Sequence, residues 1–110
     1  MTSVVRVLQP SGILDGNSAN DLARDVVAHA QADATIVLLD LSAVEFINSS
    51  GIGALVSALK ATKQLGAELY ICSPSFQVRD IFRITKMNKL FKIFLTREEF
   101  EKETGMSVLV

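Results

Sequence analysis

Short apolar runs and longer segments with helical periodicity alternate along this chain. Apolar, partly β-branched runs predict strands at residues 4–8, 36–41, 69–72 and 92–95, because such residues suit a buried, pleated backbone. The run Ile36-Val37-Leu38-Leu39 has no polar alternation, which is typical of a strand buried on both faces. The chain therefore carries four predicted strands, with room for a fifth.

Helical patterns lie between these runs. Asn17 or Ser18 can cap a first helix that ends near Ala32. A second helix is predicted from Asn48-Ser49-Ser50-Gly51 to about Leu65, and two shorter ones over residues 75–84 and 97–103. The second helix has the clearest apolar stripe, at positions i, i+3, i+4 and i+7: Ile52, Leu55, Val56 and Leu59.

The remaining segments are predicted to be connections between these elements. Residues 9–17 read as a loop marked by Pro10 and Gly12, and residues 42–47 read as a link whose Val44 and Phe46 point inward. The tail from Met106 to Val110 has no pattern that assigns it.

This alternation of strands and helices predicts the α/β class with right-handed crossovers. We expect a single domain over residues 1–110, since no repeat or linker interrupts the chain. Its four- to five-stranded, mostly parallel sheet is flanked by about four helices. We expect the sheet to be mixed, because the first strand precedes the repeating pattern.

Composition and charge narrow the classes of function. A chain of 110 residues with 49% apolar residues can bury one hydrophobic core without disulfide bonds or a structural metal ion. Its net charge of −1 argues against a nucleic-acid partner, which needs a clustered basic excess. The apolar runs are too short to span a membrane, and the N-terminus lacks a secretory pattern. The expectation is a cytoplasmic protein with no membrane association.

Few residues could carry catalysis, and no enzyme activity is predicted. His29 and Cys72 are the only histidine and cysteine, so no His/Cys metal cluster can form, and no G-x-S-x-G surrounds the serines. Cys72-Ser73-Pro74-Ser75 at a strand–helix junction is similar to a thioredoxin-type site. No proline follows Pro74, however, so a buried cysteine at a strand end is the favoured interpretation.

Gly51-Ile52-Gly53 at a helix start raises the possibility of phosphate binding. The pattern G-x-G-x-x-G fails at Val56, and Gly-Lys-Ser/Thr is absent, so we predict no nucleotide or other cofactor.

A basic stretch follows the third predicted strand, and only Asp80 opposes it. Its members are Arg79, Arg83, Lys86, Lys89 and Lys92. The last predicted helix carries the opposite charge on four glutamates: Glu98, Glu99, Glu101 and Glu103. A solvated helix face is the favoured interpretation, and an acidic partner is the alternative.

Two adjacent serines at the start of the second helix form the remaining chemical feature. One serine suffices to cap the helix through a backbone N–H. The other hydroxyl, near the same positive helix end, could carry a regulatory phosphate. Spacing alone leaves both interpretations open.

In the order of its motifs the chain resembles the STAS domain family, which occurs in anti-anti-sigma factors and at the ends of sulfate transporters. The resemblance covers nearly the whole chain. It is carried by residues 11–15, 36–41 and 66–69, by Phe46-Ile47-Asn48-Ser49-Ser50-Gly51-Ile52-Gly53-Ala54-Leu55, and by the stretch from Ile81-Phe82 to Phe91-Lys92-Ile93.

The bacterial members carry Asp-Ser-Ser/Thr-Gly, whose first serine is phosphorylated by a partner kinase. Ser49 matches that serine, and Asp15 matches an acidic residue near the phosphoacceptor. The resemblance implies phosphorylation at Ser49 and partner contacts from a set around it: Asp15, Asn48, Ser50, Gly51 and Ile52. Asn48 departs from the family, which usually has aspartate there.

The mechanism implied by the resemblance is partner switching. The unphosphorylated domain binds an anti-sigma factor that is also a serine kinase of the histidine-kinase-like ATPase fold. Phosphorylation releases the domain, and a serine phosphatase resets it. The alternative is a non-phosphorylated scaffold or accessory subunit of a sensory assembly or lipid-transport complex.

Overall fold

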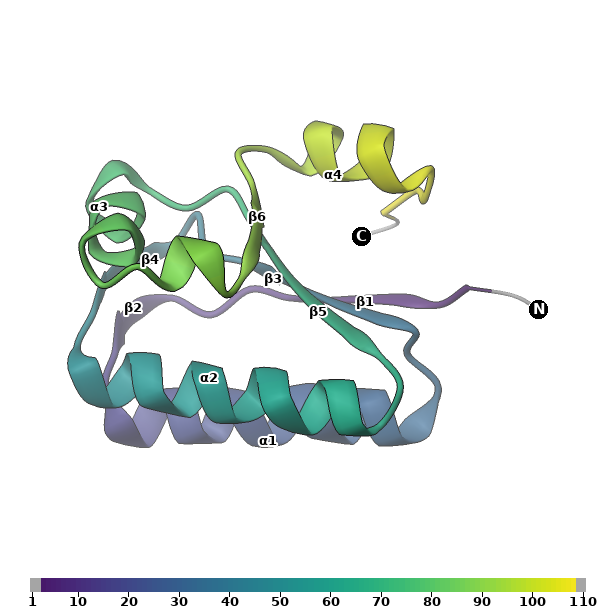
Figure 1. The fold of residues 1–110 in the computed structure, drawn as a ribbon, viewed down its shortest axis with the longest axis horizontal. Helices are drawn as coiled ribbons and strands as arrows, with labels where there is room; N and C mark the ends of the chain where they lie inside the picture. The colour runs from purple at the N-terminus through teal and green to yellow at the C-terminus, as the bar shows by residue number, and fades with distance from the viewer. Residues whose placement is uncertain (1–2, 109–110) are drawn as a thin grey trace.

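The structure is a computed structural model that describes residues 3–108 (Figure 1). The strands are β1 (Val5–Leu8), β2 (Gly12–Leu14), β3 (Ile36–Asp40), β4 (Val44–Ile47), β5 (Glu68–Cys72) and β6 (Lys92–Phe94). The helices are α1 (Gly16–Ala32), α2 (Ser49–Gln64), α3 (Phe76–Ile84), the short 3₁₀ helix η1 (Met87–Lys89) and α4 (Arg97–Thr104).

Four strands form the main sheet in the order β1-β3-β5-β6, and β2 pairs with β4 in a second, two-stranded sheet. Every pairing in the described range is parallel. The α/β class, the four-stranded sheet and the four α-helices confirm the prediction, but the expectation of a mixed sheet is wrong. The crossover through α1 lets β1 run parallel to β3, as in any βαβ unit.

Strand β3 is buried on both faces and divides the core in two. Val37 and Leu39 face the larger cluster, which includes buried side chains of α1, α2 and α3. Ile36 and Leu38 face a smaller cluster with Phe94 and with Phe100 of α4. Figure 1 shows α1 and α2 side by side under one face of the sheet, with α4 above the other.

Two segments expected to be connections are strands. The loop predicted over residues 9–17 contains β2, and the link predicted over residues 42–47 contains β4. Val44 is buried as expected, but Phe46 is 47% exposed, because its position in β4 points to the outer face of the small sheet. The inward orientation predicted for Phe46 is therefore wrong.

The cap of α1 is also shifted. Asp15, and neither Asn17 nor Ser18, is the N-cap, and Ser18 completes a capping box with it. In the tail, Met106 and Val108 pack against the smaller cluster, whereas residues 109–110 lie outside the described residues. No helix within residues 3–108 combines the length and apolarity needed to cross a bilayer.

Candidate functional site

The candidate site lies where two helices begin at one edge of the small sheet. Leu14 at the end of β2 is paired with Ile47 at the end of β4. The next residue in each chain segment is the N-cap of a helix, Asp15 for α1 and Asn48 for α2. The Asn48 backbone N–H donates to the Leu14 carbonyl oxygen over 3.1 Å, which ties the two helix starts together.

Asn48 caps α2 with its own side chain. Its Oδ1 accepts a hydrogen bond from the Gly51 backbone N–H over 2.8 Å. Ser49 and Ser50 therefore occupy the first two helical positions, and their hydroxyls make no hydrogen bond within residues 3–108. Both side chains are exposed. The capping role considered for a serine falls to Asn48, which leaves both hydroxyls available.

The two serines differ in their neighbours. A Cβ placed on Gly16 would lie 3.3 Å from the Ser50 Cβ, so Ser50 lies against the first turn of α1. Ile52, one turn beyond Asn48, is half-buried and packs against the larger core cluster.

Gly51 has a structural reason for its identity. A Cβ on this residue would lie 2.3 Å from the Leu14 carbonyl oxygen, far inside van der Waals contact. Gly51 is buried at this close approach of α2 to β2. Its position as a partner contact stays a prediction.

Asp15 supplies a negative charge at the same edge. Its Oδ1 accepts from the backbone N–H of Ser18 at 3.0 Å, from the Ser18 hydroxyl at 3.1 Å, and from the backbone N–H of Asn17 at 3.1 Å. These hydrogen bonds, those from Ser18 foremost, hold the pKa of Asp15 below its usual value. The carboxylate is thus ionised at neutral pH.

An apolar pair that the sequence analysis missed borders these polar groups. Ile13 of β2 and Phe46 of β4 are register partners, and they are 57% and 47% exposed. The sequence carries no clear signal for this pair, because Ile13 and Leu14 are both apolar and only the two-stranded sheet determines which of them is exposed. Large apolar side chains gathered on a surface are typical of a protein contact.

Other chemistry considered for the chain gains no support. Cys72 is fully buried, as expected for a cysteine at a strand end, and burial, together with the charge of Asp40, raises the pKa of its thiol to about 11. The thiol is therefore protonated at neutral pH. Within residues 3–108 no group of three or more His, Cys, Asp or Glu side chains is placed to hold a metal ion.

A family model described as the STAS domain matches residues 2–100. The chain belongs to the STAS domain family. BtrV of Bordetella bronchiseptica, named as a candidate anti-sigma factor antagonist, is 26% identical over 87 residues, which are 79% of this chain and 75% of BtrV.

Solved structures share the fold of this STAS domain. The crystal structure of TM1081 from Thermotoga maritima, also named as a candidate anti-sigma factor antagonist, has a TM-score of 0.81 at 26% identity, covering 96% of this chain and 92% of that one. The anti-sigma factor antagonist SpoIIAA in its unphosphorylated form has a TM-score of 0.75 at 18% identity, covering 97% and 94%. A phosphorylated form of the Bacillus protein SpoIIAA is also similar, with a TM-score of 0.67 at 18% identity over 94% of this chain and 93% of that one.

Proposed function

We propose that this STAS domain is an anti-sigma factor antagonist that works by partner switching. In its unphosphorylated state it binds an anti-sigma factor that is also a serine kinase of the histidine-kinase-like ATPase fold. The kinase phosphorylates Ser49, the complex dissociates, and a serine phosphatase restores the binding state. The names of the relatives support the antagonist role, and the geometry around Ser49 supports the switch.

One observation carries the proposal. Because Asn48 caps α2, the Ser49 hydroxyl is exposed at the first helical position and is not engaged by another group within residues 3–108. A kinase can reach such a hydroxyl without disturbing the helix. In the transfer, Ser49 Oγ forms a bond to the γ-phosphorus of ATP, the bond to the bridging oxygen breaks, and ADP leaves. A base on the kinase takes the hydroxyl proton.

The surroundings of Ser49 provide a surface for the partner. Ile13 and Phe46 offer exposed apolar area, and Asp15 and Asn48 offer polar groups beside it. An apolar centre with a polar rim is the usual composition of a protein interface. We propose Asp15, Asn48, Ser50 and Ile52 as contacts, with Ile13 and Phe46 added to them.

A phosphate at this position would weaken such an interface. It brings about −1.5 to −2 charges at pH 7. Asp15 already holds a negative charge at the same edge, so the partner would face two like charges where it met one. Removing water from the new charge in the complex adds a further free-energy cost. A total cost of about 3 kcal/mol would lower the affinity for the partner roughly a hundredfold.

The test uses candidate anti-sigma factor kinases with Mg-ATP, intact mass, phosphosite mapping and calorimetric binding. We expect one phosphate, on Ser49. Ser49→Asp should fold normally and bind the kinase about a hundredfold more weakly, whereas Ser49→Ala should bind it and gain no phosphate. Ser50→Ala removes the neighbouring hydroxyl and should still be phosphorylated on Ser49, even if the loss of a contact slows the reaction.

Phosphate on Ser50 alone, or equal binding by Ser49→Asp and the wild type, contradicts the proposal. A domain that binds without ever being phosphorylated would instead support an accessory subunit.

A further inference from the structure

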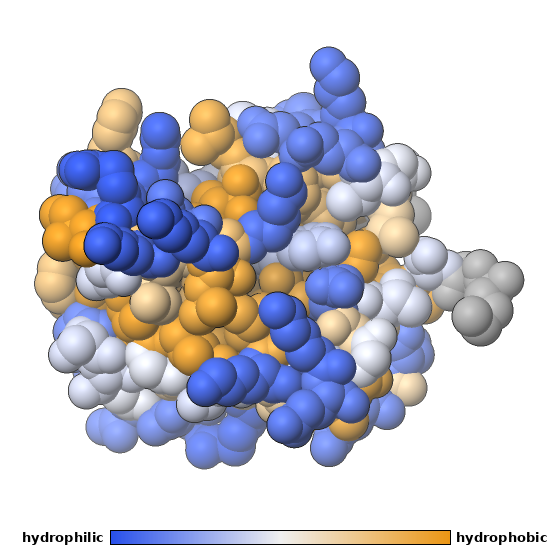
Figure 2. Space-filling model, in the orientation of Figure 1, coloured by the Kyte–Doolittle hydropathy of each residue, from blue (hydrophilic) through white to orange (hydrophobic). Residues whose placement is uncertain are grey.

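A second exposed surface has a different character from the one around Ser49. Seven large hydrophobic side chains within residues 3–108 are markedly exposed, and four of them fall between residues 76 and 95. These four are Phe76, Ile84, Leu90 and Leu95, and two of them, Phe76 and Leu95, line one hollow. Figure 2 shows apolar and hydrophilic side chains side by side on this face of the molecule.

The same twenty-residue stretch concentrates the positive charge of the chain. It holds five basic residues and one acidic residue, a net charge of +4, whereas the rest of the chain holds six basic and eleven acidic residues, a net charge of −5. A net charge of −1 for the whole molecule hides this separation. Solubility alone does not require such a segregation of charge.

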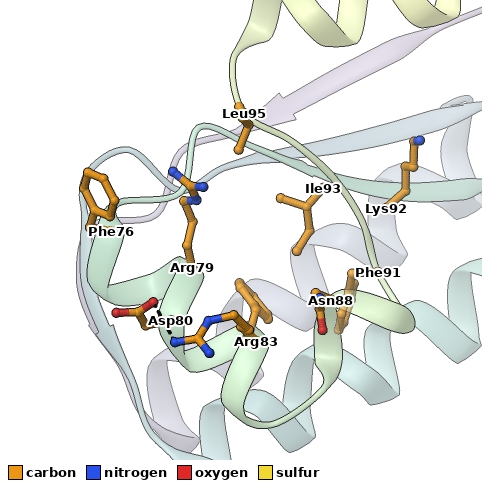
Figure 3. Close-up of a pocket in the computed structure, with 10 residues that line it drawn as sticks. Phe76, Arg79, Asp80, Arg83, Asn88, Phe91, Lys92, Ile93 and Leu95 are labelled. Carbon is orange, nitrogen blue, oxygen red and sulfur yellow. Dashed lines mark hydrogen bonds and ion pairs between the residues drawn. The ribbon is translucent and has the colours of Figure 1, made fainter.

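The centre of this surface is a hollow of ≈ 430 Å³ between α3 and β6. The buried rings of Phe82 and Phe91 lie at its floor, with their centroids 5.9 Å apart. Figure 3 shows Arg79 and Arg83 projecting from α3, with Ile93 and Leu95 across the hollow from them. A hollow of this size can take one or two large apolar side chains.

The cations at the rim have little to neutralise them. Arg83 pairs with Asp80 at 3.3 Å, but both side chains are more than half exposed, so this pair contributes little. Arg79 forms no ion pair within residues 3–108, and its guanidinium lies 5.2 Å from the ring centroid of Phe76, a side chain that is 79% exposed. The Arg79–Phe76 pair presents a flat, charged and apolar face to solvent.

We propose that this hollow is a docking site for an acidic segment of a partner protein that carries a large apolar side chain. The apolar side chain enters the hollow over Phe82 and Phe91. Carboxylates beside it pair with Arg79 and Arg83, whose side chains line the hollow. This site shares no residue with the surface proposed around Ser49 and does not depend on the switch proposed there.

The shape of the surface favours a protein segment over a membrane. An apolar surface that binds lipid protrudes into the bilayer, whereas part of the apolar area here forms the floor of a hollow. The most acidic element of a second copy of this chain fits less well. This element, helix α4, buries its one large apolar side chain, Phe100, and therefore has nothing to place in the hollow.

The experiment measures fluorescence anisotropy with a short synthetic peptide that combines glutamates with leucine and phenylalanine. A second peptide has serine at the apolar positions, and a third has lysine at the acidic ones. We expect only the first to bind, with amide shifts in NMR spectra confined to residues 76–95. Combined Arg79→Glu and Arg83→Glu should weaken binding about tenfold or more, and so should Phe76→Ala.

The matched control carries Lys60→Glu and Lys63→Glu, the same change of charge on exposed positions of α2. It should bind the first peptide as the wild type does, and so should Ser49→Asp, which separates this site from the proposed switch. The proposal is overturned if the peptide shifts residues outside 76–95 or if the control weakens binding equally. Tighter binding to vesicles of anionic lipid, or self-association of the free protein that Arg79→Glu abolishes, overturns it as well.

Discussion

The position of Ser49 depends on Gly51, which has no side chain. Gly51 brings α2 against the backbone of β2, so that the cap and both serines stand beside the start of α1. Gly53, on the same helix, has no atom within 4 Å of a Cβ added to it. The two glycines therefore play different parts.

We expect opposite effects from alanine at these two positions. Gly51→Ala should destabilise the domain by about 1–3 kcal/mol, because the Leu14 carbonyl must move to make room. Gly53→Ala should stabilise it by about 0.5–1 kcal/mol, since alanine has the higher helix propensity. Urea denaturation of both variants measures the difference. A Gly51→Ala variant as stable as the wild type would show that α2 can shift freely against β2.

Asn48 is the departure from the family motif, and the structure assigns it the capping role. Asn48→Asp should keep the hydrogen bond from Gly51 and add a charge at the positive end of α2, worth about 0.3–1 kcal/mol of stability. If the partner kinase requires the carboxylate, phosphorylation of Ser49 should also become faster. Chemical denaturation and intact mass over time measure the two effects. A variant that is less stable than the wild type would contradict the capping role.

At the scale of elements, the long ones could be predicted from sequence and the short ones could not. The buried run Ile36–Leu39 and the stripe of α2 hold enough residues for a period to show. Strands β2 and β4 have three and four residues, and Pro10 and Gly12 make the first of them look like a loop. Only their pairing with each other makes them strands, and this pairing is not local in the sequence.

The site shows the same division. Asn48 and Ser49 could be found because they start a recognisable helix, whereas Asp15 was assigned only through the resemblance to the STAS domain family. The N-cap of α1 could not, since Asp15, Asn17 and Ser18 are all good caps and only the backbone decides among them. Ile13 and Phe46 were missed because their exposure depends on the two-stranded sheet.

The C-terminal helix α4 is attached to the main sheet by an ion pair. Arg97 Nε donates to Asp40 Oδ2 over 2.9 Å, and the Asp40 side chain is only 6% exposed. Burial raises the pKa of Asp40, but hydrogen bonds from Ser42 and Arg97 outweigh it, so the pKa lies below its usual value. Asp40 therefore stabilises the fold above about pH 4 and loses this effect as the pH falls through its folded pKa.

We expect Asp40→Asn to cost about 3 kcal/mol at neutral pH, because it leaves Arg97 without its charged partner. The difference from the wild type should shrink as the pH falls from the usual carboxyl pKa, about 4, towards the lowered pKa of folded Asp40. Urea denaturation at neutral and acidic pH measures both. Asp33→Asn is the control, since its pair with Arg6 is about half exposed and should contribute at most about 1 kcal/mol. Equal losses of unfolding free energy in both variants would show that the buried Arg97–Asp40 pair stabilises the fold no more than the exposed Arg6–Asp33 pair.

At the scale of the whole molecule, the two proposed surfaces are built from different elements. The Ser49 surface is formed by the ends of β2 and β4 and the starts of α1 and α2, whereas the basic hollow lies between α3 and β6. Their charges also differ, with Asp15 at the first and a net charge of +4 over residues 76–95 at the second. One domain could then hold two partners, of which only the first responds to phosphorylation.

This division requires that phosphorylation change an interface and leave the fold intact. The phosphate would stand exposed at the first turn of α2, where the helix dipole contributes about 0.3–1 kcal/mol. The negative charge of Asp15 at the same edge offsets part of this gain. Since about 1 kcal/mol moves the Tm of a domain of this size by roughly 4–8 °C, we expect the Tm of the phosphorylated domain to lie within about 5 °C of the wild type.

Differential scanning calorimetry of the phosphorylated and unphosphorylated domain measures this shift. Ser57→Asp is the control for charge, because Ser57 is exposed in the middle of α2 and gains nothing from the helix end. Ser49→Asp should be at least as stable as Ser57→Asp. A phosphorylated domain whose Tm falls by much more than about 5 °C would mean that the phosphate unfolds α2. The switch would then act on the basic hollow as well, since loss of the core behind α2 would also disturb Phe82 and Phe91, which pack in the same cluster.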